Sequence, residues 1–411
     1  MGPRVAIVAE NASFRFGGES SLPLHYFFRL RRRGAEAWLI VHGRTRPELD
    51  LLFPEDGARI ITIPDMWIHK LLWRLSRLLP RRVSEATFGT AMGLFNQVLQ
   101  RQIVRRLVRE QGIQVVHQPT PVSPKAPSFL YGLGVPVLIG PMNGGMQYPH
   151  AFRKDESAFT RAFVAAGRGA ANAINRLIPG KRDARLLLVA NRRTKEALPS
   201  CVRGDVVVVP ENGVDLEIWT PGMGTAKDEA DAGARFLFLG RLVDWKRLDI
   251  ALHALAQTPG ATLKVIGDGP MRGEWAALAE TLKLGERVQF VGWLPQKESA
   301  EHLREATALL LPSIFECGGA VVLDAMAMGI PVIATAWGGP EDYLDESCGI
   351  LVAPTSEADL VAGFARGMQA LGADRELCGR LGRAGRDRVV AQYDWDKKID
   401  AMIAVYRGLL P

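Results

Sequence analysis

Two carboxylates stand eight positions apart in one stretch of the chain, Glu316 and Asp324. Glu316 precedes the glycine pair Gly318 and Gly319, and Asp324 falls on the helix predicted to follow. The helical repeat places the two acids near one face, about two turns apart. The free N–H groups of the helix N-terminus lie between them. Carboxylates accept hydrogen bonds from sugar hydroxyls and N–H groups bind a diphosphate, so this pattern predicts a sugar-nucleotide site.

A simpler explanation of the two acids is that they only complement the helix dipole. Near a helix N-terminus each acid would stabilise the helix by roughly 0.3–1 kcal/mol. The sequence that follows, MAMGIPVIAT and then a second glycine pair at 338–339, is not required by that explanation. The flanking pattern therefore favours the binding site.

Two cations follow a second predicted strand, 235–239. Gly240 leads to Arg241, and Lys246 stands five positions later at the predicted start of a helix. Cations at a helix start oppose the helix dipole, so stability alone does not explain them. Together with the helix N–H groups they suit a diphosphate leaving group, on which negative charge develops as a glycosidic bond breaks.

The residue types argue against a metal or disulfide framework. The four cysteines show no close-paired spacing, and there is no clustered acidic metal motif. Cys317, beside Glu316, is interpreted as a small neutral wall residue of the site. We therefore expect neither a metal nor a cofactor, only a donor substrate.

The rest of the chain alternates short apolar runs with helical patterns, which is typical of α/β domains with parallel sheets. At 411 residues two domains are expected. We place the first at 1–204 with the terminal helix 395–411 added, and the second at 205–394. No apolar run approaches the ~20 residues of a membrane span. The first residues predict a strand and no signal peptide, so we expect the chain in the cytoplasm.

Charge is divided unevenly along the chain. Residues 1–220 carry a net charge of +13 and residues 221–411 one of −6. The basic half suggests an anionic partner, either a membrane surface or an anionic acceptor. No nucleic-acid-binding motif is present.

The region 66–110 holds nine basic and two acidic residues, and part of it has a helical apolar stripe. It could lie on the anionic inner face of a membrane, next to a lipid-linked acceptor. An ordinary helix that packs its apolar stripe on the sheet and exposes its charges would show the same pattern. Both interpretations stay open at this point.

The stretch 315–343 resembles the E-x7-E signature of retaining glycosyltransferases of family 4, with Asp324 at the position where the family usually has Glu. The likeness extends to the G-R-x-x-x-x-K pattern at 240–246, although Arg247 stands where Gly is common. It covers 205–410 specifically and 1–204 in outline. The resemblance implies the GT-B fold, two Rossmann-like domains that face a central cleft, with a terminal helix that crosses back to the first domain.

The resemblance also implies roles for individual residues. Glu316 would hold the transferred sugar and Asp324 the ribose, while Arg241 and Lys246 would bind the diphosphate. The remaining donor-binding residues implied by the family are Gly17, Gly18, Gly267, Trp293, Leu294, Cys317, Gly318 and Gly319.

His117 ends a predicted strand, where a side chain of a doubly wound sheet points into the ligand crevice. It resembles the histidine that the family places beside the transferred sugar, which implies a catalytic role. The alternative is a histidine that is tied into the fold by hydrogen bonds.

The function implied is transfer of a sugar from a UDP- or GDP-sugar to an acceptor hydroxyl with retention of configuration. The acceptor would be a saccharide or lipid-linked saccharide of envelope or exopolysaccharide synthesis. A GT-B sugar-nucleotide epimerase and a non-catalytic sugar-nucleotide-binding protein are the alternatives.

Overall fold

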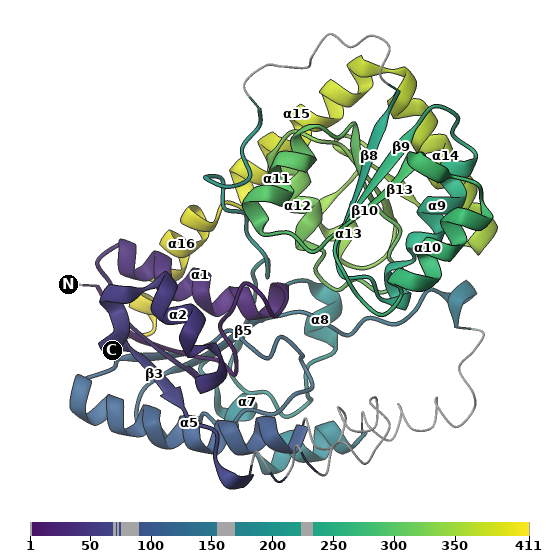
Figure 1. Ribbon diagram of the computed structural model, residues 1–411. Helices are drawn as coiled ribbons and strands as arrows, with labels where there is room; N and C mark the ends of the chain where they lie inside the picture. Colours follow the sequence, from purple (N-terminus) through teal and green to yellow (C-terminus); the bar gives the residue numbers. More distant parts are fainter. Residues whose placement is uncertain are drawn as a thin grey trace. The chain divides into compact units, whose positions relative to one another are not determined.

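The computed structural model describes residues 2–68, 71, 74, 90–153, 169–222 and 233–410 (Figure 1). The chain forms two compact units. Unit 1 comprises Met1–Gly145, Ala158–Glu211 and Lys398–Pro411, and unit 2 comprises Met146–Ser157 and Asn212–Lys397. Each unit is built on one parallel β-sheet, as the alternating pattern predicts.

The sheet of unit 1 has seven strands in the order β3-β2-β1-β4-β5-β6-β7. Its inner strands consist mostly of buried apolar residues, because helices cover both faces of a parallel sheet. The chain order reverses direction beside β1, the arrangement of a doubly wound fold. The strands are β1 (Arg4–Val8), β2 (Glu36–His42), β3 (Ile60–Ile63), β4 (Val115–Gln118), β5 (Val137–Met142), β6 (Leu186–Val189) and β7 (Asp205–Val208).

Helices α1 and α5 lie on opposite faces of this sheet (Figure 1). The α-helices of unit 1 are α1 (Gly18–Arg32), α2 (Arg46–Leu52), α5 (Thr90–Gln111), α7 (Gly180–Asp183) and α8 (Arg192–Glu196), with the 3-10 turns η1 (Gly43–Thr45) and η2 (Pro54–Arg59). The last helix, α16 (Trp395–Gly408), belongs to unit 1 from Lys398 onward. Its buried Tyr406 hydrogen-bonds to His117 of β4, and its Asp400 pairs with Arg33, which confirms the predicted association of the terminal helix with the first domain.

The sheet of unit 2 has six strands in the order β10-β9-β8-β11-β12-β13. The strands are β8 (Arg235–Leu239), β9 (Thr262–Ile266), β10 (Val288–Gly292), β11 (Ala308–Leu311), β12 (Val332–Thr335) and β13 (Gly349–Val352). The helices are α9 (Leu248–Ala256), α10 (Arg272–Thr281), α11 (Gln296–Arg304), α12 (Ala320–Ala327), α13 (Gly339–Tyr343), α14 (Glu357–Ala373) and α15 (Arg375–Gln392). The 3-10 turns are η4 (His150–Phe152), η5 (Asp244–Lys246) and η6 (Gly285–Arg287).

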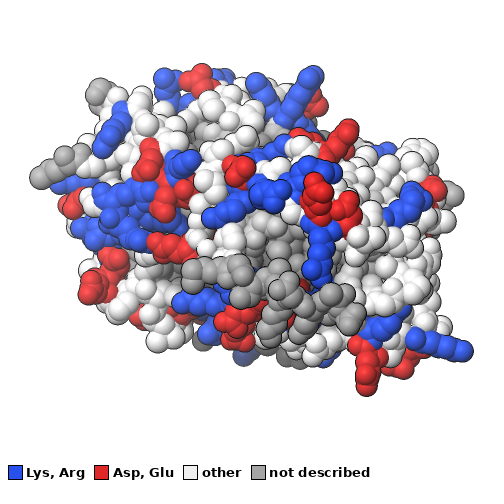
Figure 2. All heavy atoms as spheres, turned by 90° about the horizontal axis from the view of Figure 1, so that it is seen from above, with Lys and Arg blue, Asp and Glu red and all other residues white. Residues whose placement is uncertain are grey.

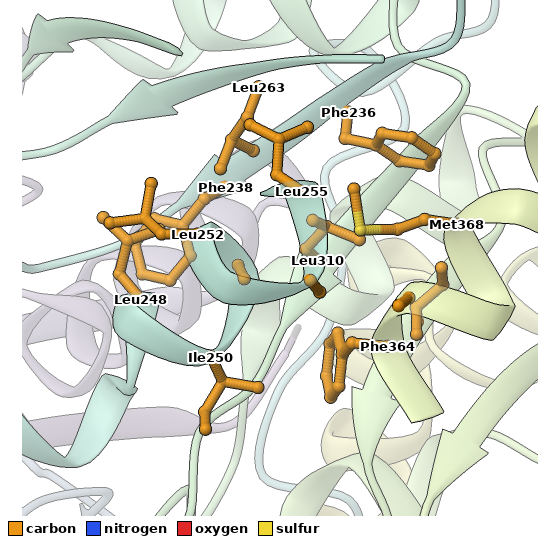
Figure 3. Close-up of a cluster of buried hydrophobic side chains, with 14 of the residues drawn as sticks. Phe236, Phe238, Leu248, Ile250, Leu252, Leu255, Leu263, Leu310, Phe364 and Met368 are labelled. Atoms are coloured by element: carbon orange, nitrogen blue, oxygen red, sulfur yellow. The ribbon is translucent and has the colours of Figure 1, made fainter. Parts of the chain in front are cut away.

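The central strand β8 sends alternate side chains to two separate cores. Phe236 and Phe238 pack with residues of α9 and α14, as Figure 3 shows, whereas Leu237 belongs to the cluster beneath α12. This alternation follows from the two-residue repeat of a strand. Both faces of β8 are therefore buried, and its carboxyl end is held in a fixed position.

The observed boundaries differ from the predicted ones. The boundary predicted at 204/205 would place β7 in the second domain, but β7 pairs in parallel with β6 and is the edge strand of the first sheet. The segment 146–157 belongs to unit 2, where the Trp337 indole N–H donates to the Gln147 carbonyl at 2.8 Å. Strand propensity is local and cannot tell which sheet a strand joins.

Much of the basic region 66–110 lies outside the described residues, which lack 69–70, 72–73 and 75–89. In the part that is described, Trp67 is 68% exposed and Leu71 46% exposed. On α5, by contrast, Arg101 stacks on Tyr131 and Arg105 donates to the Gly132 carbonyl. These two cations contact the protein itself, as expected of an ordinary packed helix.

The surface and helices add two observations on charge and membranes. Figure 2 shows Lys and Arg side chains interspersed with Asp and Glu side chains over the face that it presents. Within the described ranges, none of the helices has the length and apolar composition needed to cross a bilayer.

Candidate active site

The candidate site of unit 2 lies in the loops that follow neighbouring strands. β8 runs into Gly240 and Arg241, β9 into Gly267, β11 into the segment 312–319 and β12 into the segment 336–338. The carboxyl ends of parallel strands meet at one edge of their sheet, where α/β proteins bind ligands. The predicted donor-binding residues of the second domain thus gather at one edge.

The central contact of this edge is an ion pair. Lys246 Nζ donates to Glu316 Oε2, and the two side chains are only 14% and 15% exposed. The sequence predicts separate partners for them, a diphosphate for Lys246 and a sugar for Glu316. In the structure each is also oriented by the other, across 70 residues of sequence.

Close backbone packing of three glycines fixes the position of Glu316. Gly339 N–H donates to the Glu316 carbonyl at 2.6 Å, and a Cβ on Gly339 would overlap the Gly318 carbonyl oxygen. Gly319 has φ +68° and is the N-cap of α12. Residues with side chains rarely adopt that conformation, so glycine suits this turn. The turn 316–319 is consequently held against the start of α13.

Gly267 has a packing reason as well as the predicted binding one. Its φ is +136°, and a Cβ there would overlap the Gly240 carbonyl oxygen. Its N–H donates to the Gly292 carbonyl at 2.7 Å. Gly267 therefore brings the loops after β8, β9 and β10 together.

Asp324 lies on α12, on the second turn of that helix. It is half-buried, and burial raises the pKa of its carboxyl well above the ordinary value. In the described part of the chain no side-chain hydrogen bond is recorded for it. Burial thus favours the protonated carboxyl, a form that can donate as well as accept a hydrogen bond, which suits a diol such as ribose.

Four further predicted residues border the edge with different exposures. Arg241 is exposed. Trp293, just after β10, is 58% exposed, and Leu294 packs on the core. Cys317 is half-buried. An exposed arginine and an exposed indole leave a cation and an aromatic face for a ligand.

Arg247 is a residue whose role the sequence did not reveal. It is the N-cap of α9 with φ +49°, in the left-handed region that glycine adopts most readily. Its guanidinium pairs with Asp249 and Glu357, each at 2.7 Å, and lies over the Phe152 ring. A positive φ is not readable from residue type when the residue is an arginine.

His117 of unit 1 is fully buried, unlike its predicted place in a ligand crevice. Its Nδ1 lies 2.7 Å from Tyr406 Oη and its Nε2 lies 2.6 Å from the Gly140 carbonyl oxygen. Burial lowers its pKa to about 3, so the ring is neutral. With Nε2–H donating to Gly140 and Nδ1 accepting from Tyr406, both nitrogens are occupied. This geometry matches the alternative interpretation, a histidine tied into the fold.

Gly17 and Gly18 form the turn from β1 to α1 in unit 1, as predicted. Gly17 is the N-cap of α1 with φ +101°, and the space where its Cβ would stand is open. The glycine is thus required by backbone conformation and leaves room for a ligand.

Comparison with known families agrees with the geometry of unit 2. Residues 226–388 match the family model described as glycosyl transferases group 1. Over this segment the chain is similar to group 1 glycosyltransferases. Lys246, Glu316 and Asp324, together with the glycines that position them, all fall within it.

Curated glycosyltransferases and a glycogen synthase match part of the chain. The lipopolysaccharide core biosynthesis glycosyltransferase LpsE of Rhizobium meliloti is 31% identical over 40% of this chain and 47% of its own length. A glycogen synthase of Mycobacterium tuberculosis is 30% identical over 49% and 48%. A D-inositol 3-phosphate glycosyltransferase of Catenulispora acidiphila is 34% identical over 48% and 50%. The chain spans about half the length of the curated relatives it matches.

Solved structures match over nearly the whole chain. Sucrose-phosphate synthase from Thermosynechococcus elongatus has a TM-score of 0.65 at 21% identity, covering 99% of both chains. HepE from Anabaena, crystallised with UDP-glucose, has a TM-score of 0.66 at 16% identity, covering 99% of this chain and 100% of its own. WaaG, a glycosyltransferase involved in lipopolysaccharide biosynthesis, has a TM-score of 0.59 at 17% identity, covering 97% and 99%. These likenesses confirm the predicted GT-B fold.

Among the residues that the structure describes, no three His, Cys, Asp or Glu side chains are grouped to hold a metal ion. Lys246 and the exposed Arg241 are cations near the carboxyl edge of the unit 2 sheet, where they could meet an anionic ligand.

Proposed function

We propose that this protein is a retaining glycosyltransferase that moves a sugar from a nucleoside-diphosphate sugar to an acceptor hydroxyl. The observation that carries the proposal is the Lys246–Glu316 ion pair at the carboxyl edge of the unit 2 sheet. The pair joins a cation suited to a diphosphate to a carboxylate suited to a sugar hydroxyl. The pair would therefore contact both sides of the bond that breaks, the sugar through Glu316 and the diphosphate leaving group through Lys246.

The proposed step breaks the bond between the anomeric carbon and the diphosphate oxygen. The acceptor oxygen forms its new bond on the same face, and its proton goes to the departing phosphate oxygen. Lys246 has three N–H donors, of which one is held by Glu316, so two remain for phosphate oxygens. With Arg241 and the N-terminus of α12, Lys246 would stabilise the developing charge. Glu316 would orient the sugar and Asp324 the ribose.

A UDP- or GDP-sugar is the proposed donor, and the crystallised complexes of HepE with UDP and with UDP-glucose support UDP as the first choice to test. The reaction is proposed to need no metal, because two cations would neutralise the diphosphate. The acceptor is proposed to be a saccharide or lipid-linked saccharide in polysaccharide assembly. We propose a cytoplasmic location, at the inner face of the membrane if residues 66–110 bind lipid.

A donor screen tests the proposal. Purified protein is mixed with UDP-, GDP- and ADP-sugars in EDTA, and nucleotide release is followed with and without liposomes that carry a polyprenyl-linked saccharide. We expect acceptor-dependent release of one nucleotide, and an α-linked product from an α-linked donor. Conversion of the donor sugar without an acceptor would identify an epimerase instead. Donor binding without turnover on any acceptor would favour the binding protein.

A further inference from the structure

A pocket of about 420 Å³ opens within unit 1, at the carboxyl edge of its sheet. Its walls come from the loop after β1, the first turn of α1, the first half of α5 and the loop after β4. Every lining residue belongs to unit 1. The volume lies in the lower part of the range of small-molecule sites, roughly 300–1,000 Å³, and suits a ligand of the size of a sugar.

Two carboxylates of the lining are held in place by the protein. Glu19 Oε1 accepts a hydrogen bond from the Val122 N–H at 3.0 Å. Glu10 Oε1 accepts from Arg44 Nη2 at 2.7 Å, while its Oε2 faces Gly93 of α5. Within the described ranges, no hydrogen bond is recorded for Oε2 of either group. Each carboxylate thus has one fixed oxygen and a second one that can accept from a ligand.

Amide side chains in the same pocket are fixed at one end in the same way. Gln97 Oε1 accepts from the Phe129 N–H at 3.0 Å, and Gln118 Oε1 accepts from Ser128 Oγ at 2.6 Å. Within the described residues no hydrogen bond is recorded for the NH2 groups of these two side chains, so they can donate to a ligand. Asn11 Oδ1 is a buried acceptor without a hydrogen-bond partner in the described part of the chain. The pocket therefore offers donors and acceptors side by side, which is what vicinal hydroxyl groups require.

The charge of the lining is opposite to the charge of the half of the chain that contains it. Residues 1–220 have a net charge of +13, from which an anionic acceptor is predicted. The described lining nevertheless holds two carboxylates and none of the Lys, Arg or His side chains. Glu10 is ion-paired with Arg44, which lies outside the lining, whereas no ion pair is recorded for Glu19 within the described residues. A phosphate placed here would be repelled by Glu19, because like charges repel.

We propose that this pocket binds the acceptor and selects a polyhydroxylated ring without phosphate or carboxylate groups, such as a neutral hexose or an amino sugar. The inference rests on the proposed function and adds the substrate class of the acceptor. It separates this protein from relatives such as the D-inositol 3-phosphate glycosyltransferases, whose named acceptor carries a phosphate.

The test measures binding of methyl glucoside, methyl glucosaminide and glucose 6-phosphate to the full chain by ligand-observed NMR, with UDP present. We expect both glycosides to bind at least tenfold more tightly than the phosphate. In Glu19→Gln and Glu10→Gln, shape is kept and charge removed, so this preference should fall about tenfold. Asp205→Asn is the matched control. It removes an exposed carboxylate at the amino end of β7, whereas the pocket lies at the carboxyl edge of the sheet, so the preference should be unchanged.

Three results would overturn the inference: tighter binding of glucose 6-phosphate, no binding of any of the three sugars, or an unchanged preference in both folded Gln variants. Circular dichroism and the melting temperature establish that each variant is folded. Binding of UDP, measured on the same samples, reports on unit 2 independently. If the wild type does not bind UDP, the proposed function is contradicted. If it binds UDP but does not prefer the glycosides over glucose 6-phosphate, only the proposed acceptor class is contradicted.

Discussion

Lys246 and Glu316 form a largely buried ion pair at the carboxyl edge of the unit 2 sheet, although 70 residues separate them in the chain. Each side chain limits the orientations of the other before any ligand binds. Preorganised charges stabilise a transition state without reorganisation at the moment of reaction. Removal of one partner also leaves the other charge partly buried and unpaired.

The pair should therefore act as a unit in catalysis. We expect Lys246→Met and Glu316→Gln each to lower kcat/KM by about 10²–10³-fold, in line with the loss of a preorganised group. The double variant should lose little more than the worse single variant, because groups that act together are not additive. Steady-state kinetics with the donor identified by the screen provides the measurement. Full additivity of the two losses would show that the residues act separately.

Asp324 is expected to bind the donor as a neutral carboxyl. Because burial raises its pKa well above the ordinary value, Asp324→Asn should keep UDP affinity within about threefold of the wild type. Asp324→Ala should weaken UDP binding about tenfold, the loss of one good hydrogen bond. Asp324→Glu restores the residue usual in family 4, and a gain in affinity is expected if the side chain reaches ribose. Isothermal titration calorimetry measures the affinity of the wild type and the three variants for UDP. Equal affinities for all four proteins would exclude a contact between Asp324 and the ribose.

Buried neutral histidines should make the stability of unit 1 depend on pH. The pKa values of His25 and His117 fall to about 3 on burial, from 6.5 when unfolded. Below pH 6.5 the unfolded chain binds the additional protons, so stability is complete above that pH and declines as the pH falls toward 3. Each of the two histidines should lower the free energy of unfolding by about 2 kcal/mol at pH 5 relative to pH 7.5.

Chemical denaturation of His117→Asn at both pH values tests this expectation. The variant should be less stable than the wild type at pH 7.5, by about 1–3 kcal/mol for the disturbed hydrogen bonds. Its further loss on going to pH 5 should be about 2 kcal/mol smaller than that of the wild type. His150→Asn, a change at an exposed histidine, should keep the wild-type pH dependence. If the stability of His117→Asn depends on pH as strongly as that of the wild type, His117 is not a source of the pH dependence.

Arg247 combines a strained backbone with favourable side-chain contacts. Arg247→Ala loses the contacts to Asp249, Glu357 and Phe152 and keeps the positive φ, so it should be less stable than the wild type. Arg247→Gly loses the same contacts but relieves the strain, and should be about 1 kcal/mol more stable than Arg247→Ala.

Lys283 offers a matched control for the backbone part of this argument. It has φ +55° and an exposed side chain, and no ion pair is recorded for it within the described residues. Lys283→Gly should therefore be about 1 kcal/mol more stable than Lys283→Ala, and no less stable than the wild type. Urea denaturation measures all four variants. Equal stability within each Gly and Ala pair would show that the positive φ costs nothing.

The sequence by itself determined the strands, the alternation of strands with helices, and the loops that carry the proposed donor site. Runs such as RFLFL of β8 and VIAT of β12 are strands because their own residues are apolar and bounded by glycine or polar turns. The residues from Glu316 to Asp324 were recognisable for the same reason, since the turn and the helix that position them are adjacent in the chain.

Only the tertiary structure decided which groups meet across the chain. The pairing of Lys246 with Glu316, the burial of His117 beneath Tyr406 and the place of β7 in the first sheet all depend on contacts between distant segments. The acidic pocket in the basic half is the clearest case. Net charge sums over the whole surface, whereas a ligand meets only the few side chains that folding brings around one cavity.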